Sequence, residues 1–577
     1  MNGKSCGITR KLYLELTPPT EEDSRSAQQR ILEAIEAKTD LDTSEMSKIT
    51  GSSGNTGKTI IKIPLDILRK LHPFCQDVNW KLTVSLAWDG TCWQVVALEA
   101  GDTSGAHYGL AVDLGSTTVV MQLVDCESGE VVVQESAYNR QIAYGEDILS
   151  RIFYSKDQPE RLEEIRRATV ETIVTLMEKL EGRAGIPLRT SSEALETNAA
   201  EEDSDGNRAG RCISMVVAGN TTMTHFLLGM DAFCVFSTPY AVQADQPGFL
   251  KGMELGIPIP GYVFCYPGKA NYLGGDIISG MVATDLHHRD SISLFFDVGT
   301  NGELVVGNRD FLLCGAGAAG PALEGGVVKT GMRAAEGAVQ HVKLVEDCGN
   351  GVLTDVIGGG TPKGICGSGI IDLISELFMH GILDLRGKLV PEASDAIVWR
   401  AGTEDSSEDR AERASDSLGC GGDAAGQDGE YAFQYAPGLY FYQSDIHEFI
   451  RTKAAAYTMM EYLLSETGMN LNDVGDFYMA GAFGSHVDVT SAVNIGMYPD
   501  VDPVRIHAVG NTSLEGAQKL LLDRSVAEEL PEILDLMTYV QFGAVEGFLE
   551  KMTAASALPH TDLERYPSVK ARLNQYA

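Results

Sequence analysis

Apolar positions along the chain follow two spacings in turn, and these spacings predict alternating helices and strands. Apolar residues at helical spacing predict helices over 26–38, twice within 145–180, over 276–286 and over 446–466. Short apolar runs before glycine-rich turns predict strands at 216–218, 477–479 and 505–508. This alternation is typical of an α/β fold, in which ligands bind at strand ends.

The same pattern divides the chain into three parts. Residues 1–104 read as a small α+β unit, and residues 105–290 and 291–577 read as two larger α/β units. Two acidic stretches rich in glycine and serine, about 189–211 and about 402–430, interrupt the larger units. Their composition buries too little apolar surface to fold, so we predict disordered insertions.

The most informative feature is an internal repeat. Residues 109–133 and 293–313 each contain an apolar strand ending in Asp-x-Gly, a tight turn, a second strand, a polar turn and a third strand. Asp113 and Asp297 hold equivalent places in the two copies. One Asp-x-Gly carries no information, because turns use both residues widely. Two copies in matching frames predict a pair of related hairpins.

The two hairpin turns have the chemistry of a phosphate site. Their backbone N–H groups and hydroxyls suit phosphate oxygens, and Asp113 and Asp297 suit Mg²⁺, which keeps several waters and few carboxylates. Facing each other across a cleft, the hairpins would grip a triphosphate from both sides. Ordinary β-hairpins are the alternative. The turn residues are Gly115, Ser116, Thr117 and Thr118 in the first copy, and Gly299, Thr300, Asn301 and Gly302 in the second.

Further candidates lie at other strand ends. Gly481 and Gly484 permit the close backbone approach that a base or ribose requires. Glu303 could orient or deprotonate an attacking water, or could be a solvated side chain. Asn220 and Thr221 open a helix, which suits an anion, although N-capping explains them too.

Asp276 opens another predicted helix and either caps it or holds a Mg²⁺ water, with the cap favoured.

Residues 51–59 resemble a P-loop, but Ser52 stands where the motif needs glycine and no apolar strand precedes it. We therefore reject that segment as a nucleotide site.

Charge and cysteine spacing remove several function classes. The chain has 45 Lys+Arg and 81 Asp+Glu, a net charge of −36, which argues against nucleic-acid and polybasic membrane contacts. It has no transmembrane-length apolar run and no apolar leader, so we expect a cytoplasmic protein. The closest of its eleven cysteines, Cys75 and Cys92, are 17 residues apart, and this spacing predicts no iron–sulfur cluster.

The two hairpins and the Gly481–Gly484 loop together resemble the acetate and sugar kinase, Hsp70 and actin superfamily. With further motifs at 218–223, 274–277, 318–325, 331–335 and 364–369, residues 105–525 resemble the reductive activators of corrinoid proteins. Residues 1–104 resemble the linker and middle domain of the same proteins. The resemblance implies two duplicated actin-like (ribonuclease H-like) ATPase domains and a small N-terminal α+β domain.

The resemblance also implies a function. Family members use ATP to drive reduction of Co(II) to Co(I) on a corrinoid protein of a methyltransferase system. It implies ATP and Mg²⁺ as cofactors, with Asp113, Asp297 and Glu303 as the catalytic residues and the two aspartates as metal ligands. In one group the electron enters through an N-terminal ferredoxin-like iron–sulfur domain. This chain begins where that domain would end, so a separate ferredoxin-like donor is expected.

Other readings stay open at this point. A small-molecule kinase of the same superfamily needs an acceptor pocket with a catalytic aspartate, which the motifs do not identify. A nucleotide-switched scaffold that is not an enzyme is a further alternative. The sequence also leaves open whether the protein forms a homodimer.

Overall fold

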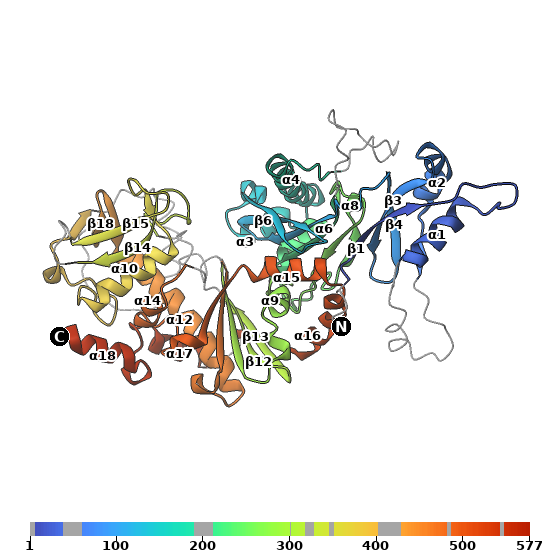
Figure 1. Cartoon of the computed structure of the whole chain (residues 1–577). Coiled ribbons are helices and arrows are strands. Elements are labelled where there is room, and N and C mark those ends of the chain that lie inside the picture. Colours follow the sequence, from blue (N-terminus) through green and yellow to red (C-terminus); the bar gives the residue numbers. More distant parts are fainter. Residues whose placement is uncertain are drawn as a thin grey trace. The chain divides into compact units, whose positions relative to one another are not determined.

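The computed structural model describes nine stretches of the chain, which divide into two compact units (Figure 1). The described residues are 6–38, 60–189, 212–299, 302–317, 328–345, 351–401, 429–481, 486–542 and 547–576. Unit 1 comprises residues 1–287 and 512–537, and unit 2 comprises residues 288–511 and 538–577. The P-loop-like run 51–59 and nearly all of both predicted insertions lie outside the described residues.

Unit 1 begins with a small four-stranded sheet of order β1-β3-β4-β2. Its strands are β1 (Thr9–Glu15), β2 (Ile61–Lys62), β3 (Lys81–Trp88) and β4 (Trp93–Ala100). Helices α1 (Ala27–Lys38) and α2 (Leu65–Asp77) pack on this sheet around buried Trp80 and Trp93. The predicted helix over 26–38 is confirmed as α1.

The larger sheet of unit 1 has the order β7-β6-β5-β8-β10-β9. Its strands are β5 (Tyr108–Leu114), β6 (Thr118–Asp125), β7 (Val131–Tyr138), β8 (Cys212–Gly219), β9 (Gly248–Lys251) and β10 (Tyr262–Cys265). Strands β5, β6 and β7 are antiparallel, whereas β8 and β10 continue parallel to β5. The first predicted hairpin is therefore present, with a parallel strand beside it.

Helices cover both faces of this sheet. Helix α4 (Pro159–Ala184) packs on β6 and β7 with α6 (Thr221–Leu228) beside it. Helices α9 (Gly275–Thr284) and α15 (Thr512–Leu522) pack against β8, and α16 (Ser525–Leu536) follows α15. The C-terminal segment 512–537 therefore returns to unit 1.

Unit 2 is built on a six-stranded sheet of order β21-β20-β11-β12-β13-β22. Its strands are β11 (Ser293–Val298), β12 (Gly302–Asn308), β13 (Phe311–Gly317), β20 (Asp476–Ala480), β21 (Ile506–Gly510) and β22 (Met537–Val540). Its main helices are α10 (Gly367–Met379), α12 (Gln443–Glu466), α14 (Val489–Asn494), α17 (Phe548–Ala555) and α18 (Pro567–Tyr576).

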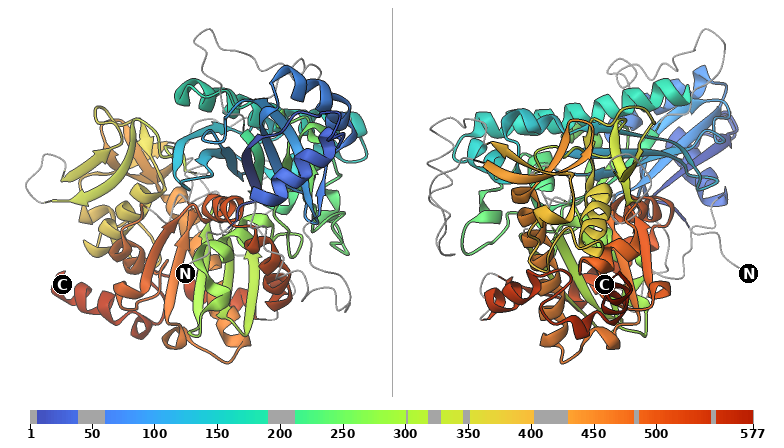
Figure 2. Two further views of the ribbon diagram at one scale, coloured as in Figure 1. Left: turned by 45° about the vertical axis from the view of Figure 1, so that its right-hand side comes forward. Right: turned by 90° about the vertical axis from the view of Figure 1, so that its left-hand side faces the viewer.

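Two three-stranded sheets complete unit 2, and further views are given in Figure 2. One contains β14 (Ala338–Leu344), β15 (Val352–Val356) and β16 (Gly364–Ile365); the other contains β17 (Ile397–Ala401), β18 (Gly429–Ala436) and β19 (Leu439–Tyr442). Gly429 and Glu430, which the composition assigned to an insertion, begin β18. The Glu430 carboxylate accepts a hydrogen bond from the Ser444 N–H at 2.7 Å and pairs with Lys329.

The strand orders confirm the predicted duplication. Five strands of each large sheet can be numbered 1 to 5 in chain order: β5, β6, β7, β8 and β10 in unit 1, and β11, β12, β13, β20 and β21 in unit 2. Across the sheet, both sets lie in the order 3-2-1-4-5. In both sheets the first strand is antiparallel to the second and parallel to the fourth. The fold is thus α/β with two duplicated actin-like domains. Among the residues that the structure describes, no helix is long and apolar enough to cross a membrane.

Candidate functional site

The turn between β5 and β6 is fixed through its carbonyl groups, which accept hydrogen bonds from two residues outside the turn. The Asn139 side chain donates to the Gly115 carbonyl at 3.0 Å, and the Asn139 N–H donates to the Thr117 carbonyl at 2.9 Å. The Arg151 guanidinium donates to the Ser116 carbonyl at 2.6 Å. Because the N–H and C=O of a peptide unit point in opposite directions, the N–H groups of Ser116 and Thr117 face the other way. Within the described residues neither N–H has an acceptor. N–H groups arranged in this way suit an anion.

Two carboxylates of unit 1 lie close to this turn. Asp113 stands at the end of β5, in register with Ala218 of β8. Asp276 is the second residue of α9, and its carboxylate accepts from the adjacent Ile277 N–H at 2.9 Å. Burial, and then the charge of the nearby Asp113, raise the pKa of Asp276 well above its usual range. A cation near both carboxylates would relieve their repulsion.

The sequence favoured a capping role for Asp276, and the structure differs. The N-cap of α9 is Gly274, with no side-chain capping bond. Spacing along the sequence could not reveal Asp276 as a neighbour of Asp113. The two aspartates are separated by 162 residues and come near each other only in the folded unit. The sequence feature that could have indicated a functional Asp276 is an acidic residue in the first turn of a helix that begins with glycines.

Helix α15 runs parallel to α9, with both N-termini beside Asp276. The Ser513 hydroxyl lies 3.4 Å from the Asp276 carbonyl, and a Cβ on Gly516 would lie 2.2 Å from the Ser279 carbonyl. Further along, Lys519 donates to the Ala283 carbonyl at 2.6 Å. Aligned N-termini add their positive partial charges at one place, which favours anions near Asp276 when a cation neutralises the carboxylates.

Asn220 and Thr221 use their side chains within the fold. The Asn220 side chain caps α6 by accepting from the Met223 N–H at 3.0 Å, and the Thr221 hydroxyl donates to the Ala270 carbonyl at 2.9 Å. The capping alternative therefore describes the Asn220 side chain. The Asn220 capping bond uses only the amide oxygen of the side chain.

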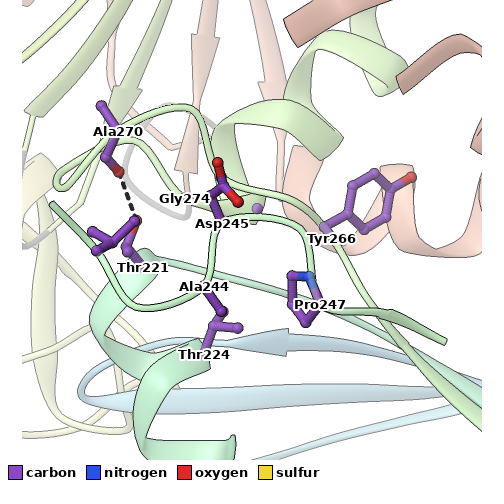
Figure 3. Close-up of a pocket in the computed structure, with 11 residues that line it drawn as sticks. Thr221, Thr224, Ala244, Asp245, Pro247, Tyr266, Ala270 and Gly274 are labelled. Atoms are coloured by element: carbon purple, nitrogen blue, oxygen red, sulfur yellow. Dashed lines mark hydrogen bonds between the residues drawn. The ribbon is translucent and has the colours of Figure 1, made fainter. Parts of the chain in front are cut away.

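A small cavity lies behind this segment, between α6 and the start of α9 (Figure 3). Figure 3 shows Thr221 and Thr224 from α6 on one side and Asp245, Tyr266 and Gly274 around the rest. The cavity measures about 10 Å³, which is room for about one water molecule. It is too small for a nucleotide or a sugar acceptor.

In unit 2, Asp297 lies between two neighbouring strands that carry other candidates. It is directly opposite Glu303 on β12 and in register with Ala480 on β20. Directly opposed residues of antiparallel strands point to the same face, so both carboxylates share one face. Glu303 is only 6% exposed, so it is not the solvated side chain of the alternative reading. Gly299 and Gly302 flank the turn, whereas Thr300 and Asn301 lie outside the described residues.

Gly481 approaches Asp297 closely. Its φ is +85°, and a Cβ there would lie 2.6 Å from the Val298 carbonyl and 2.9 Å from an Asp297 carboxylate oxygen. Only glycine fits this position without strain. Gly484 lies outside the described residues.

Family comparisons cover almost the whole chain. The model of the RACo linker region matches residues 8–105, and that of the RACo middle region matches residues 108–289. The model of the C-terminal domain of RACo, the ASKHA domain, matches residues 291–418 and 423–570. The chain belongs to the RACo family.

Individual relatives agree with this assignment. The corrinoid activation enzyme RamQ of Eubacterium limosum is 32% identical over 449 residues, covering 77% of this chain and 69% of RamQ. The [Co(II) methylated amine-specific corrinoid protein] reductase of Methanosarcina barkeri is 24% identical over 310 residues, covering 50% and 48%. The solved structure of a reductive activator for corrinoid, iron-sulfur protein is 31% identical with a TM-score of 0.80, covering 98% of this chain and 82% of its own. The predicted family is confirmed.

A RACo-family ASKHA domain implies ATP with a metal ion, and the residues present fit both. The N–H groups of Ser116 and Thr117, which have no acceptor in the described part of the chain, suit phosphate oxygens. Within unit 1, Asp113 and Asp276 carry hard oxygen atoms of the kind that Mg²⁺ prefers, and Asp297 carries the same kind of atom in unit 2. Together with the relatives, this fit supports an enzyme role.

Proposed function

We propose that this protein is an ATP-dependent activator of a corrinoid protein in a methyltransferase system, coupling ATP binding and hydrolysis to reduction of Co(II) to Co(I). The observation that carries the proposal is the hydrogen bonding of the β5–β6 turn. The carbonyls of residues 115–117 accept hydrogen bonds from Asn139 and Arg151, whereas the N–H groups of Ser116 and Thr117 have no acceptor in the described chain. The names of the relatives indicate the corrinoid target.

The residues of both hairpin turns, the acidic residues and the glycines of the 481–484 loop have roles in this proposal. Gly115, Ser116, Thr117 and Thr118 bind phosphate in unit 1, and Gly299, Thr300, Asn301 and Gly302 do so in unit 2. Asp113 and Asp297 hold Mg²⁺ through its waters, which neutralises phosphate charge. Asp276 joins Asp113 in this task. Glu303 orients the attacking water, and Gly481 with Gly484 lets adenosine approach.

The electron comes from a separate ferredoxin-like donor in this proposal. It passes to Co(II), which becomes Co(I), and the donor is oxidised by one electron. Cysteine spacing supports a separate donor, because no two of the eleven cysteines are closer than 17 residues. Nucleotide binding can favour such an uphill step only by biasing a conformation that binds the corrinoid partner differently.

The test mixes the protein, a co-encoded corrinoid protein and a chemical reductant, and follows Co(II) loss spectroscopically with and without ATP. We expect reduction only with ATP, and we expect Asp297→Asn to abolish the ATP effect. Asp290→Asn is the matched control, since that side chain is 81% exposed in the same unit. An ATP-independent rate would contradict the proposal, and phosphorylation of a small molecule would favour the kinase alternative.

A further inference from the structure

We infer that Arg151 is a positioning residue for the phosphate turn: its buried guanidinium holds the Ser116 carbonyl from behind and places a positive charge under the N–H groups that meet the nucleotide phosphates. This inference rests on the proposed function, because it assumes that the β5–β6 turn binds ATP. Arg151 itself touches no nucleotide in this inference; it acts through the turn.

The guanidinium of Arg151 reaches four oxygen atoms from α3 (Ile148–Ser155). It donates to the Ser116 carbonyl at 2.6 Å, to the Gly145 carbonyl at 2.8 Å and to the Glu146 carbonyl at 3.3 Å. It also donates to the Gln141 side-chain oxygen at 3.3 Å. Every one of these acceptors is an uncharged carbonyl group. The side chain is fully buried, with 0% exposure.

Among the residues that the structure describes, no carboxylate pairs with Arg151, and a buried charge without such a partner is unusual because its desolvation is costly. Asp147, the N-cap of α3, acts on Arg151 electrostatically, but its carboxylate accepts from the Ser150 N–H at 2.7 Å. Burial lowers the pKa of Arg151 only to about 10, so the guanidinium stays charged at neutral pH. An anion bound on the open side of the turn would supply the missing negative charge.

The network also explains why arginine is used here. Its planar fork of five donors can bind several carbonyls at once, which a lysine ammonium cannot do in the same geometry. Gln141, one of the acceptors, is fixed in turn by donating to the Thr169 hydroxyl on α4 at 2.5 Å. Arg151 thereby ties the turn to two helices of unit 1.

The substitution Gln141→Glu separates charge from geometry. It keeps the arginine and its own hydrogen bonds and gives the guanidinium a carboxylate partner, and the one bond it removes is the Gln141 donation to the Thr169 hydroxyl. We expect the affinity for ATP to fall about tenfold, the scale of one charge interaction over about 10 Å in a protein interior. The affinity for adenosine, which has no phosphate, should not change. Titration calorimetry with ATP, ADP and adenosine measures the two effects.

Arg151→Gln removes the charge and the fork, and Arg151→Lys keeps only the charge. We expect Arg151→Gln to lose at least as much ATP affinity as Gln141→Glu, with Arg151→Lys between it and the wild type. Arg30→Gln is the control for losing a buried arginine away from the turn: Arg30 is 3% exposed beside the small sheet of unit 1, donates to the Asp23 carbonyl at 2.7 Å and the Thr17 carbonyl at 3.0 Å, and, unlike Arg151, also pairs with the Asp23 carboxylate at 2.9 Å. It should lower the melting temperature without changing ATP affinity.

The outcomes are distinguishable. A wild-type protein that binds no ATP contradicts the proposed function itself. A wild type that binds ATP, with Gln141→Glu and Arg151→Gln binding it equally well, overturns only the role of Arg151. Equal losses for ATP and adenosine, in step with melting temperature, would show that Arg151 merely supports the fold, and that result also overturns it. If Arg151→Gln does not fold, Gln141→Glu decides.

Discussion

Single residues give the candidate site of each unit a different chemistry on the same order of strands. Asp113 and Asp297 hold equivalent places, yet the second acidic group comes from helix α9 in unit 1, as Asp276, and from strand β12 in unit 2, as Glu303. Asp276 shares charge repulsion with Asp113, which favours a cation-binding role. Glu303 is fixed opposite Asp297 by strand register, which favours a role in orienting water.

Asp276→Asn should separate metal binding from folding. Removing one of two close carboxylates relieves repulsion, so the melting temperature without Mg²⁺ should stay the same or rise. The rise in melting temperature on adding Mg²⁺ and ATP should shrink, because an oxygen ligand of the cation is lost. Asp66→Asn is the control, since Asp66 is also the second residue of its helix but is exposed. Loss of the Mg²⁺–ATP effect in both variants would contradict the assignment.

Gly481→Ala should weaken ATP binding more than it weakens the fold. A left-handed backbone angle costs a non-glycine residue about 1 kcal/mol or more, and here the new Cβ would also press on the Asp297 carboxylate. Gly468→Ala shares the first cost, with φ +69°, but meets no atom within 4 Å. Thermal melts and ATP titrations compare the two. Equal ATP affinity in both variants would show that the close approach to Asp297 is unimportant.

At the scale of whole elements, the parallel helices α9 and α15 pack together and position Asp276. The helices approach closely because Gly516 has no side chain to meet Ser279. Their register, with Ser513 beside Asp276 and Lys519 beside Ala283, keeps both N-termini at the same level. Displacing either helix would therefore move Asp276.

Gly516→Ala should lower the melting temperature of unit 1 and weaken Mg²⁺–ATP binding together. The added methyl group would lie 2.2 Å from the Ser279 carbonyl, so the helices must separate, at a cost of about 1–3 kcal/mol. Gly182→Ala in α4 is the control, because nothing lies within 4 Å of its Cβ. That change should instead stabilise by about 0.5–1 kcal/mol through helix propensity. The opposite order of stabilities would contradict the packing argument.

Lys453 of α12 binds backbone carbonyls at the end of α17 and in the segment that follows it. Its side-chain nitrogen is fully buried and lies within hydrogen-bond distance of the carbonyls of Ala555 and Ala557, both at 2.7 Å, and of Pro559. Lys453→Met leaves these carbonyls without their donor, which should cost unit 2 about 1–3 kcal/mol. Thermal unfolding at several pH values measures it.

The pH dependence of Lys453 has a definite sign. Burial lowers its folded-state pKa to about 7, below the ordinary lysine value of about 10.4. Between these values the unfolded chain binds more protons, so this group's contribution to stability rises with pH and is lost as pH falls toward 7. Lys453→Met should lack that slope. A wild type and variant with parallel pH profiles would contradict the shifted pKa.

At the scale of the whole molecule, the chain passes between its two units three times, at 287–288, 511–512 and 537–538. Each unit contains a six-stranded sheet in which five strands follow the same order, and both units supply candidate site residues. The stretch of about 402–430 interrupts only unit 2. The last two residues of this stretch, Gly429 and Glu430, are part of the fold, because Gly429 of β18 pairs directly with Ala401 of β17.

Replacing residues 402–428 by Asn-Gly should leave the melting temperature and ATP affinity unchanged. A two-residue turn can join a directly opposed antiparallel pair, and the removed stretch has a composition that buries little apolar surface. Removing 402–430 instead should destabilise unit 2, because Glu430 would no longer accept from Ser444. A large drop in melting temperature for the first deletion would show that the segment contributes to the fold.

Local patterns were sufficient to predict much of the fold. The helices α1, α3, α4, α9 and α12, both hairpins and the positions of Asp113 and Asp297 follow from residues near one another in sequence, because spacing and turn chemistry are local properties. The duplication was visible for the same reason, since each copy is a continuous strand–turn–strand segment.

Only the tertiary structure decided what stands beside these residues. Asp276 reaches Asp113, Arg151 reaches the Ser116 carbonyl, and 512–537 returns to unit 1, all across long stretches of chain. Such neighbours depend on which strands pair and which helices pack, and a sequence pattern records neither. The sequence by itself therefore determined the hairpins and their aspartates, and the packing of distant helices determined how each turn is held and charged.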